Sequence, residues 1–190
     1  VGYRRELAGQ GARLVPLAVA SALGAVAGAA LLLSLPASAF KAIVPAFIVI
    51  ALVLIIAQPR LSRVLGAHGG GARDRPGPVA VVGVFASGVY GGYFGAAQGI
   101  LLLAILGLAI DEDLQRINAL KVVLAGLVNL VAGVVFVFAA HVAWLPALLI
   151  ALGSVLGGIL GASQGRRLPA GALRALIVVV GVAAIVRLVA

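Results

Sequence analysis

The sequence predicts an all-α polytopic membrane protein, and three observations support this fold class. Hydrophobic residues make up 64% of the 190 residues and charged residues 10%, and the mean hydropathy is +1.26. A soluble domain of this length needs a far larger share of polar residues at its surface. Stretches without a charged residue cover 14–40, 76–110 and 122–165. Each of them exceeds the ~20 residues that a transmembrane helix requires.

Five uninterrupted transmembrane helices are expected along the chain. Each is an apolar segment that ends at charged residues or at a short polar loop. Trp144, at the beginning of the fourth, is expected to anchor that helix at the outer membrane interface, where tryptophan is enriched. The five predicted spans are 14–33, 42–57, 117–138, 143–162 and 171–188.

Segment 79–110 is also apolar, but glycines interrupt it. Its middle reads GVYGGYFGAAQG, from Gly88 to Gly99. Each glycine inside a helix costs about 1 kcal/mol relative to alanine. The flanking pieces, 79–87 and 100–110, are too short to cross a membrane alone. We therefore predict two re-entrant half-helices that meet at a glycine-rich tip within the membrane.

The placement of the basic residues predicts the topology. The net charge is +9, and nearly all of the 14 basic residues lie in short segments between the apolar stretches. Cytoplasmic loops are enriched in lysine and arginine, and all basic segments share one side only if 79–110 enters and leaves by the same face. We expect that side to be the cytoplasmic side of the membrane. The basic segments contain Arg4, Arg5 and Arg13; Arg60, Arg63, Arg73 and Arg75; Arg116 and Lys121; and Arg166, Arg167 and Arg174.

Two parts of the chain resemble each other. PASAFKAIV begins at Pro36 and PAGALRALI at Pro169, and each follows a similar segment, ALGAVAGA or ALGSVLGG. The predicted topology places the first copy outside and the second inside, so the copies are inverted repeats, which are common in secondary transporters. We expect 1–75 to be the C-terminal part of a first repeat whose beginning is missing, with two transmembrane helices and a basic loop. Residues 76–190 are expected to form the second repeat, with the broken hairpin and three spans.

The glycine-rich tip is the best candidate for a binding site. A second half-helix that starts near Gly99 would direct unpaired backbone N–H groups into the site, and glycines let an oxyanion approach them closely. The alternative is that the glycines serve only tight helix packing, as Gly24 with Gly28 and Gly153 with Gly157 are expected to do. The candidate substrate-binding residues of the tip are Tyr90, Gly91, Gly92, Tyr93, Gly95, Gln98 and Gly99.

Three further polar residues lie on the helix predicted after the tip. Asn118 and Lys121 share one face of it, at positions i and i+3, and both are added to the candidate substrate-binding residues. Lys121 can attract an anion, because charges inside membranes are usually functional, or its side chain can extend to the cytoplasmic interface. Asn129, near mid-span, is expected to hydrogen-bond to another helix rather than to contact the substrate.

Other classes of function find little support. The chain has no cysteine, and its histidines, His68 and His141, are far apart and lack carboxylate neighbours, so we expect no metal site and no cofactor. No nucleophile is paired with a base, so an enzyme is not expected. No folded basic face is available for a nucleic acid. The acidic residues Asp111, Glu112 and Asp113 are expected to form a solvated helix start that caps the helix beginning at Leu114.

The runs GVYGGYFGAAQGILLLAILGL, LQRINALKVVLAGLVNLVAGVVF and HVAWLPALLIALGSVLGGILGASQGRRLPAGALRALIVVVG together resemble the second half of a TauE/SafE family protein. The hallmark of that family is a Gly-Gly-x-x-Gly cluster followed by further glycines. Gly91, Gly92 and Gly95 match the cluster and Gly99 follows it. Residues 96–98 read AAQ, where many members have further glycines, and this departure concerns the substrate rather than the family.

The resemblance implies a multi-pass transporter of the bacterial inner membrane that exports sulfite, sulfoacetate or related organosulfonates by alternating access around the glycine-rich site. Its partners would be a small anion and the lipid bilayer. Assembly into a homo-oligomer is a further option that the resemblance leaves open. Two alternatives remain at this point: an anion channel or passive pore on the same scaffold, and a structural membrane subunit.

Overall fold

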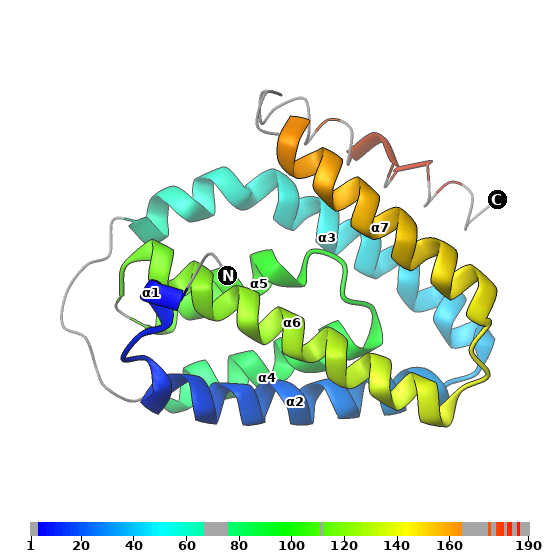
Figure 1. Cartoon of the computed structure of the whole chain (residues 1–190), viewed down its shortest axis with the longest axis horizontal. Helices are drawn as coiled ribbons and strands as arrows, with labels where there is room; N and C mark the ends of the chain where they lie inside the picture. Colours follow the sequence, from blue (N-terminus) through cyan, green and yellow to red (C-terminus); the bar gives the residue numbers. More distant parts are fainter. Residues whose placement is uncertain are drawn as a thin grey trace.

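The computed structural model describes residues 4–66, 76–110 and 112–164 together with a few positions between 175 and 186, and all regular structure in this part is helical. The predicted span 171–188 and the repeat copy at Pro169 lie almost entirely outside the described residues, as do the basic residues Arg166, Arg167 and Arg174. The helices, shown in Figure 1, are α1 (Arg4–Leu7), α2 (Gly11–Ser34), α3 (Ala37–Gly66), α4 (Pro78–Tyr93), α5 (Gln98–Ala109), α6 (Leu114–Ala139) and α7 (Trp144–Gln164).

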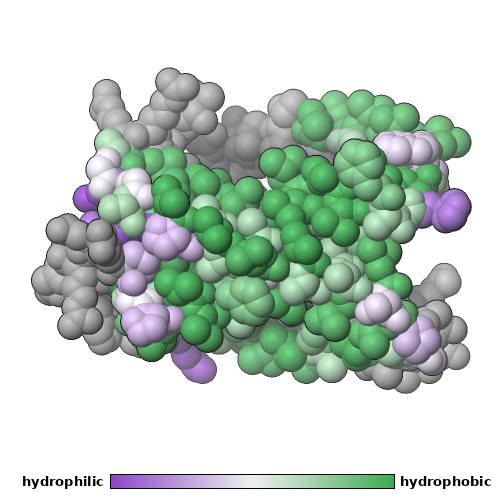
Figure 2. Space-filling view, turned by 90° about the horizontal axis from the view of Figure 1, so that it is seen from below, coloured by the Kyte–Doolittle hydropathy of each residue, from purple (hydrophilic) through white to green (hydrophobic). Residues whose placement is uncertain are grey.

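The surface of the helical bundle is strongly apolar. Helices α2 and α6 are long and apolar enough to cross a membrane, and shorter apolar stretches lie in α3, α4, α5 and α7. In Figure 2, polar residues gather toward the ends of the molecule and a wide apolar band separates them. Large apolar side chains such as Phe138, which is 87% exposed, contribute to this surface. Soluble monomers rarely expose so much contiguous apolar surface, whereas a lipid environment favours it.

The four predicted spans that lie within the described residues coincide with helices, but α3 is longer than expected. Its apolar stretch, Ile43–Ala57, agrees with the predicted span 42–57. The helix itself begins at Ala37, directly after Pro36, and continues to Gly66. The predicted span was shorter than the helix because hydropathy identifies only the apolar residues that lie in the hydrocarbon core of a membrane. The helical hydrogen bonds of the backbone continue into the polar residues on either side.

Helices α4 and α5 form an antiparallel hairpin, and the predicted break in segment 79–110 is confirmed. The chain turns at residues 94–97, where Gly95 and Ala97 adopt positive φ angles of 76° and 59°. Beyond the turn, the Gln98 side chain returns to the Ser87 carbonyl oxygen, 3.2 Å away. The two half-helices therefore run side by side, as Figure 1 shows.

The break is shorter than predicted. Helix α4 continues through Gly88, Gly91 and Gly92 to Tyr93, rather than ending at residue 87, and α5 begins at Gln98. The expectation that glycine density alone would end the helix was wrong. Close packing against α2 offsets the propensity cost, so that only the residues after Tyr93 leave the helix.

Glycines let the backbones of α2 and α4 approach each other closely. A Cβ atom added to Gly88 would lie 2.6 Å from the Ser21 carbonyl oxygen. The three other glycines of this contact would place a Cβ in overlap with backbone atoms of the opposite helix. Small residues have this role in many membrane helix pairs, so the packing interpretation holds for this part of the glycine cluster. The glycines in contact are Gly24 and Gly28 on α2 and Gly88 and Gly92 on α4.

The second glycine pair expected to serve packing makes no such contact. A Cβ added to Gly153 or to Gly157 of α7 would have no described atom within 4 Å. Nearly all described side chains of α7 are exposed. Spacing alone therefore does not distinguish a packing glycine from one on a free surface.

The N-terminal ends of α2, α4 and α6 meet at one end of the bundle. Leu17, Ala80 and Ile117 pack there into one buried cluster with Ile110, the last residue before the α5–α6 loop. In Figure 1 the C-terminal end of α3, which carries Arg60, lies at the same end of the bundle. This arrangement agrees with the predicted common side for the basic segments before α2, after α3 and around the start of α6.

Glu112 forms a buried ion-pair network at that end rather than a solvated helix start. Its carboxylate contacts the guanidinium of Arg13 and lies 3.5 Å from that of Arg116. The side chains of Arg13 and Glu112 are only 7% and 11% exposed. The expectation of a solvated Glu112 was wrong, because the fold brings α2 against the α5–α6 loop. The predicted cap is confirmed for Asp113, whose carboxylate accepts a hydrogen bond from the Gln115 amide at 3.0 Å.

We predict that Glu112→Gln destabilises the protein by about 3 kcal/mol, since removing one partner of a buried ion pair is strongly destabilising and Glu112 contacts both Arg13 and Arg116. Asp113→Asn is the matched control, because it removes one carboxylate at the next position while asparagine caps a helix as well as aspartate does. Unfolding of both variants in detergent micelles would be followed by circular dichroism. Equal stability of the two variants would contradict the structural role of the network.

Candidate functional site

The beginning of α5 lies beside the side chain of Lys121. A Cβ atom added to Gly99 would lie 3.7 Å from Cδ of this lysine. Lys121 is about 10 Å along α6 from Leu114, at 1.5 Å per residue. Within the described part of the chain, its ammonium has no hydrogen bond or ion pair. Asn118 lies one turn before Lys121 and is half-buried.

The turn that leads into α5 has free backbone donors. The Gln98 amide reaches the Gly95 carbonyl oxygen at 3.3 Å, and the Ile100 amide reaches that of Ala97 at 2.9 Å. Among the described residues, no partner accepts the amides of Ala97 and Gly99. The positive end of the α5 dipole and a lysine side chain therefore lie close together, which is an arrangement suited to an anion.

Tyr90 and Gln98 stabilise the turn. The Tyr90 hydroxyl donates to the Ala96 carbonyl oxygen at 2.6 Å, and Gln98 Nε2 donates to the Ser87 carbonyl oxygen. Gln98 is 3% exposed, and its amide occupies the space that a side chain at Gly91 would need. In this conformation both side chains hold the hairpin together. The side-chain amide of Gln98, which was expected to donate to a substrate, donates to the Ser87 carbonyl oxygen instead.

A hollow of about 640 Å³ lies on the other side of the turn. Residues 91–96 line it from the hairpin, Leu32 from α2, and four residues from α6: Asn129, Ala132, Gly133 and Phe136. Of the predicted site residues it brings together Gly91, Gly92, Tyr93 and Gly95. Gln98, Gly99, Asn118 and Lys121 do not line it. The predicted site is thus divided between two places, one at each side of the turn.

Asn129 differs from its sequence-based expectation. It was expected to hydrogen-bond to another helix, but its amide has no hydrogen-bond partner in the described part of the chain. The side chain is exposed and lines the hollow. The prediction failed because the facing surface of the hairpin is glycine-rich, and the hydroxyl of Tyr93, which lines the same hollow, is buried and does not reach the amide.

An aromatic cluster, which was not predicted from the sequence, joins α3 to the turn. The ring of Phe47 lies 5.2 Å from that of Tyr90, 5.6 Å from that of Tyr93 and 5.7 Å from that of Phe94, measured between centroids. The contacts of Phe47 with the two tyrosines are edge-to-face, a favourable arrangement of aromatic rings. Phe47 lies in an otherwise ordinary apolar span, so only the tertiary structure places it at the tip.

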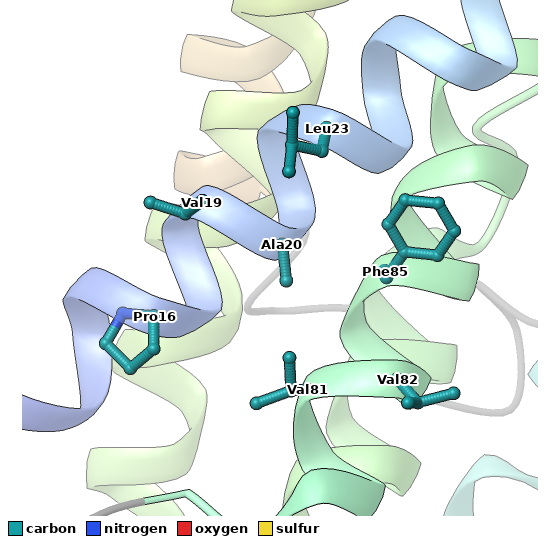
Figure 3. A pocket seen from close by; sticks show the side chains of 7 residues that line it. All are labelled: Pro16, Val19, Ala20, Leu23, Val81, Val82 and Phe85. Atoms are coloured by element: carbon teal, nitrogen blue, oxygen red, sulfur yellow. The ribbon is translucent and has the colours of Figure 1, made fainter.

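A separate groove between α2 and α4 carries no polar side chain. Figure 3 shows the residues that line it: Pro16, Val19, Ala20 and Leu23 from α2 and Val81, Val82 and Phe85 from α4. Its volume is about 460 Å³. A groove of this composition suits contact with hydrocarbon and offers nothing to orient a polar solute.

Comparison with known proteins identifies the family. A family model described as "Sulfite exporter TauE/SafE" matches residues 1–188. The chain belongs to the TauE/SafE family. A relative of this TauE/SafE protein, named "Probable membrane transporter protein ORF9" and from Sinorhizobium sp, is 33% identical over 178 residues. The match covers 93% of this chain and 66% of the relative, so the chain spans about two thirds of that protein's length. No solved structure matches.

The TauE/SafE assignment agrees with the apolar surface and the long apolar helices of the structure. Together they support a membrane transporter located in a lipid membrane. Membership of a transporter family also implies movement of a solute rather than a chemical reaction on it.

Proposed function

We propose that this TauE/SafE protein is a multi-pass secondary transporter of the bacterial inner membrane that exports small anions. Sulfite, sulfoacetate and other organosulfonates are the proposed substrates, in agreement with the description of the family model. The anion binds at the start of α5, between the free backbone amides there and the ammonium of Lys121.

The position of Lys121 carries this proposal. A charge inside an apolar helix is unfavourable unless a partner compensates it, and the described residues provide no carboxylate for this lysine. Its side chain instead packs over Gly99, at the positive end of α5. Two positive groups that face one small space favour an anionic ligand. Glycine at position 99 keeps that space open.

The proposed mechanism is alternating access between two inverted halves, 1–75 and 76–190. The segments ALGAVAGA and ALGSVLGG, which suggested the repeat, lie in α2 and α7. Figure 1 shows that these helices run in opposite directions between the two ends of the bundle, which supports the inverted arrangement. Broken helices that meet within the membrane supply the binding site in many transporters of this kind.

Uptake of radiolabelled sulfoacetate and sulfite into proteoliposomes tests the function. We expect saturable flux above that of protein-free vesicles, and we expect counterflow, in which unlabelled anion on one side accelerates entry of label from the other. Counterflow requires a carrier, because a passive pore does not couple the two movements. Flux equal to that of empty vesicles would overturn the proposal, and saturation without counterflow would favour a channel.

A further inference from the structure

We propose that the hollow beyond the turn is a second anion position, in which Asn129 and Tyr93 hold the substrate after it leaves Lys121. This inference rests on the proposed function, since it adds a second station to the same pathway. The ligand is an anion with several hydrogen-bond acceptors, such as a sulfonate.

The amide of Asn129 is the principal donor of this position. It lies on a helix whose central part is otherwise apolar, it is exposed to the hollow, and it hydrogen-bonds to no described residue. An amide near the middle of a transmembrane helix needs a partner, because lipid offers none. A solute in the hollow would supply it.

Tyr93 contributes a second polar group without a partner. The residue is 7% exposed and lines the hollow, and its hydroxyl oxygen is buried without a hydrogen-bond partner among the described residues. Tyr90, three residues earlier in the same aromatic cluster, differs in this respect because its hydroxyl is bonded to Ala96. Buried hydroxyl groups are usually paired. A rotation of the Tyr93 side chain would bring its hydroxyl to an anion bound in the hollow, and the anion would accept a hydrogen bond from it.

The two positions differ in charge, so their affinities for an anion are expected to differ. Lys121 and Asn129 are about 12 Å apart along α6, at 1.5 Å per residue, and Lys121 does not line the hollow. The hollow offers neutral donors, whereas the position at α5 includes an ammonium. Neutral donors lack the direct attraction between opposite charges that the ammonium of Lys121 adds. The second position therefore binds the anion more weakly, as release from a transporter requires.

Equilibrium binding of radiolabelled sulfoacetate to the purified full chain in nanodiscs tests this inference. The wild-type protein is expected to bind two anions, one more tightly than the other. Asn129→Leu and Tyr93→Phe are each expected to weaken the second binding event about tenfold, the loss of one hydrogen bond to an ionised ligand, and to leave the first unchanged. Gln115→Leu, which removes an exposed side-chain amide elsewhere on α6, is the control and should leave both binding events in place, and Tyr90→Phe serves only as a comparison of stability.

Thermal unfolding of the same variants separates a ligand contact from a structural role. Tyr93→Phe should unfold at the wild-type temperature or above it, because no hydrogen bond is lost. Tyr90→Phe should unfold lower, because the bond to Ala96 is lost. A single binding event in the wild type would overturn the second position and leave the proposed function intact. The same conclusion would follow if neither Asn129→Leu nor Tyr93→Phe changed the weaker binding event. No binding and no flux would overturn both.

Discussion

Lys121→Met is expected to reduce saturable anion flux between roughly tenfold and a hundredfold. A hydrogen bond to a charged group contributes about 1.5–3 kcal/mol, and each 1.4 kcal/mol corresponds to a factor of about ten. Methionine retains the length and the apolar contacts of the lysine side chain over Gly99 but has no charge. The measurement is sulfoacetate flux into proteoliposomes that contain equal amounts of folded protein.

Two controls accompany this variant. Lys121→Arg keeps the positive charge and should retain part of the flux. Arg60→Met removes a charge from an exposed side chain of α3 and should have little effect. Unchanged flux in Lys121→Met would mean that the lysine only extends to the interface, and the anion site at the start of α5 would have to be abandoned.

Gly28→Ala is expected to destabilise the fold by about 2 kcal/mol, within the range typical of overpacking. Its Cβ would overlap the carbonyl oxygen of Val89, a backbone atom of α4 that cannot rotate away. The two helices would have to separate, and the hairpin would lose its support. The free energy of unfolding in detergent micelles measures the effect.

Gly126→Ala is the matched control on α6, where an added Cβ meets no described atom within 4 Å. It should leave stability unchanged or raise it by up to about 1 kcal/mol, the helix propensity difference between glycine and alanine. A Gly28→Ala variant as stable as Gly126→Ala would show that close packing of α2 on α4 is not required.

Composition and charge pattern were enough to predict the helical membrane fold, the break in segment 79–110 and the Asp113 cap. These features depend on local chemistry: apolar length, glycine content and the residue before a helix start. The helix that begins at Leu114 after an aspartate is an example in which one residue type at one position decides the local structure. The sequence also indicated the family, which the match over residues 1–188 confirms.

What the chain alone could not decide is how the predicted site residues are distributed in space. Glycine can end a helix or let two helices approach, and only the position of α2 assigns Gly88 to packing and Gly95 to the turn. Likewise, Asn129 is a structural amide or a ligand donor according to what faces it. Partners distant in sequence determine these roles, because a side chain's function depends on the groups within a few ångströms of it.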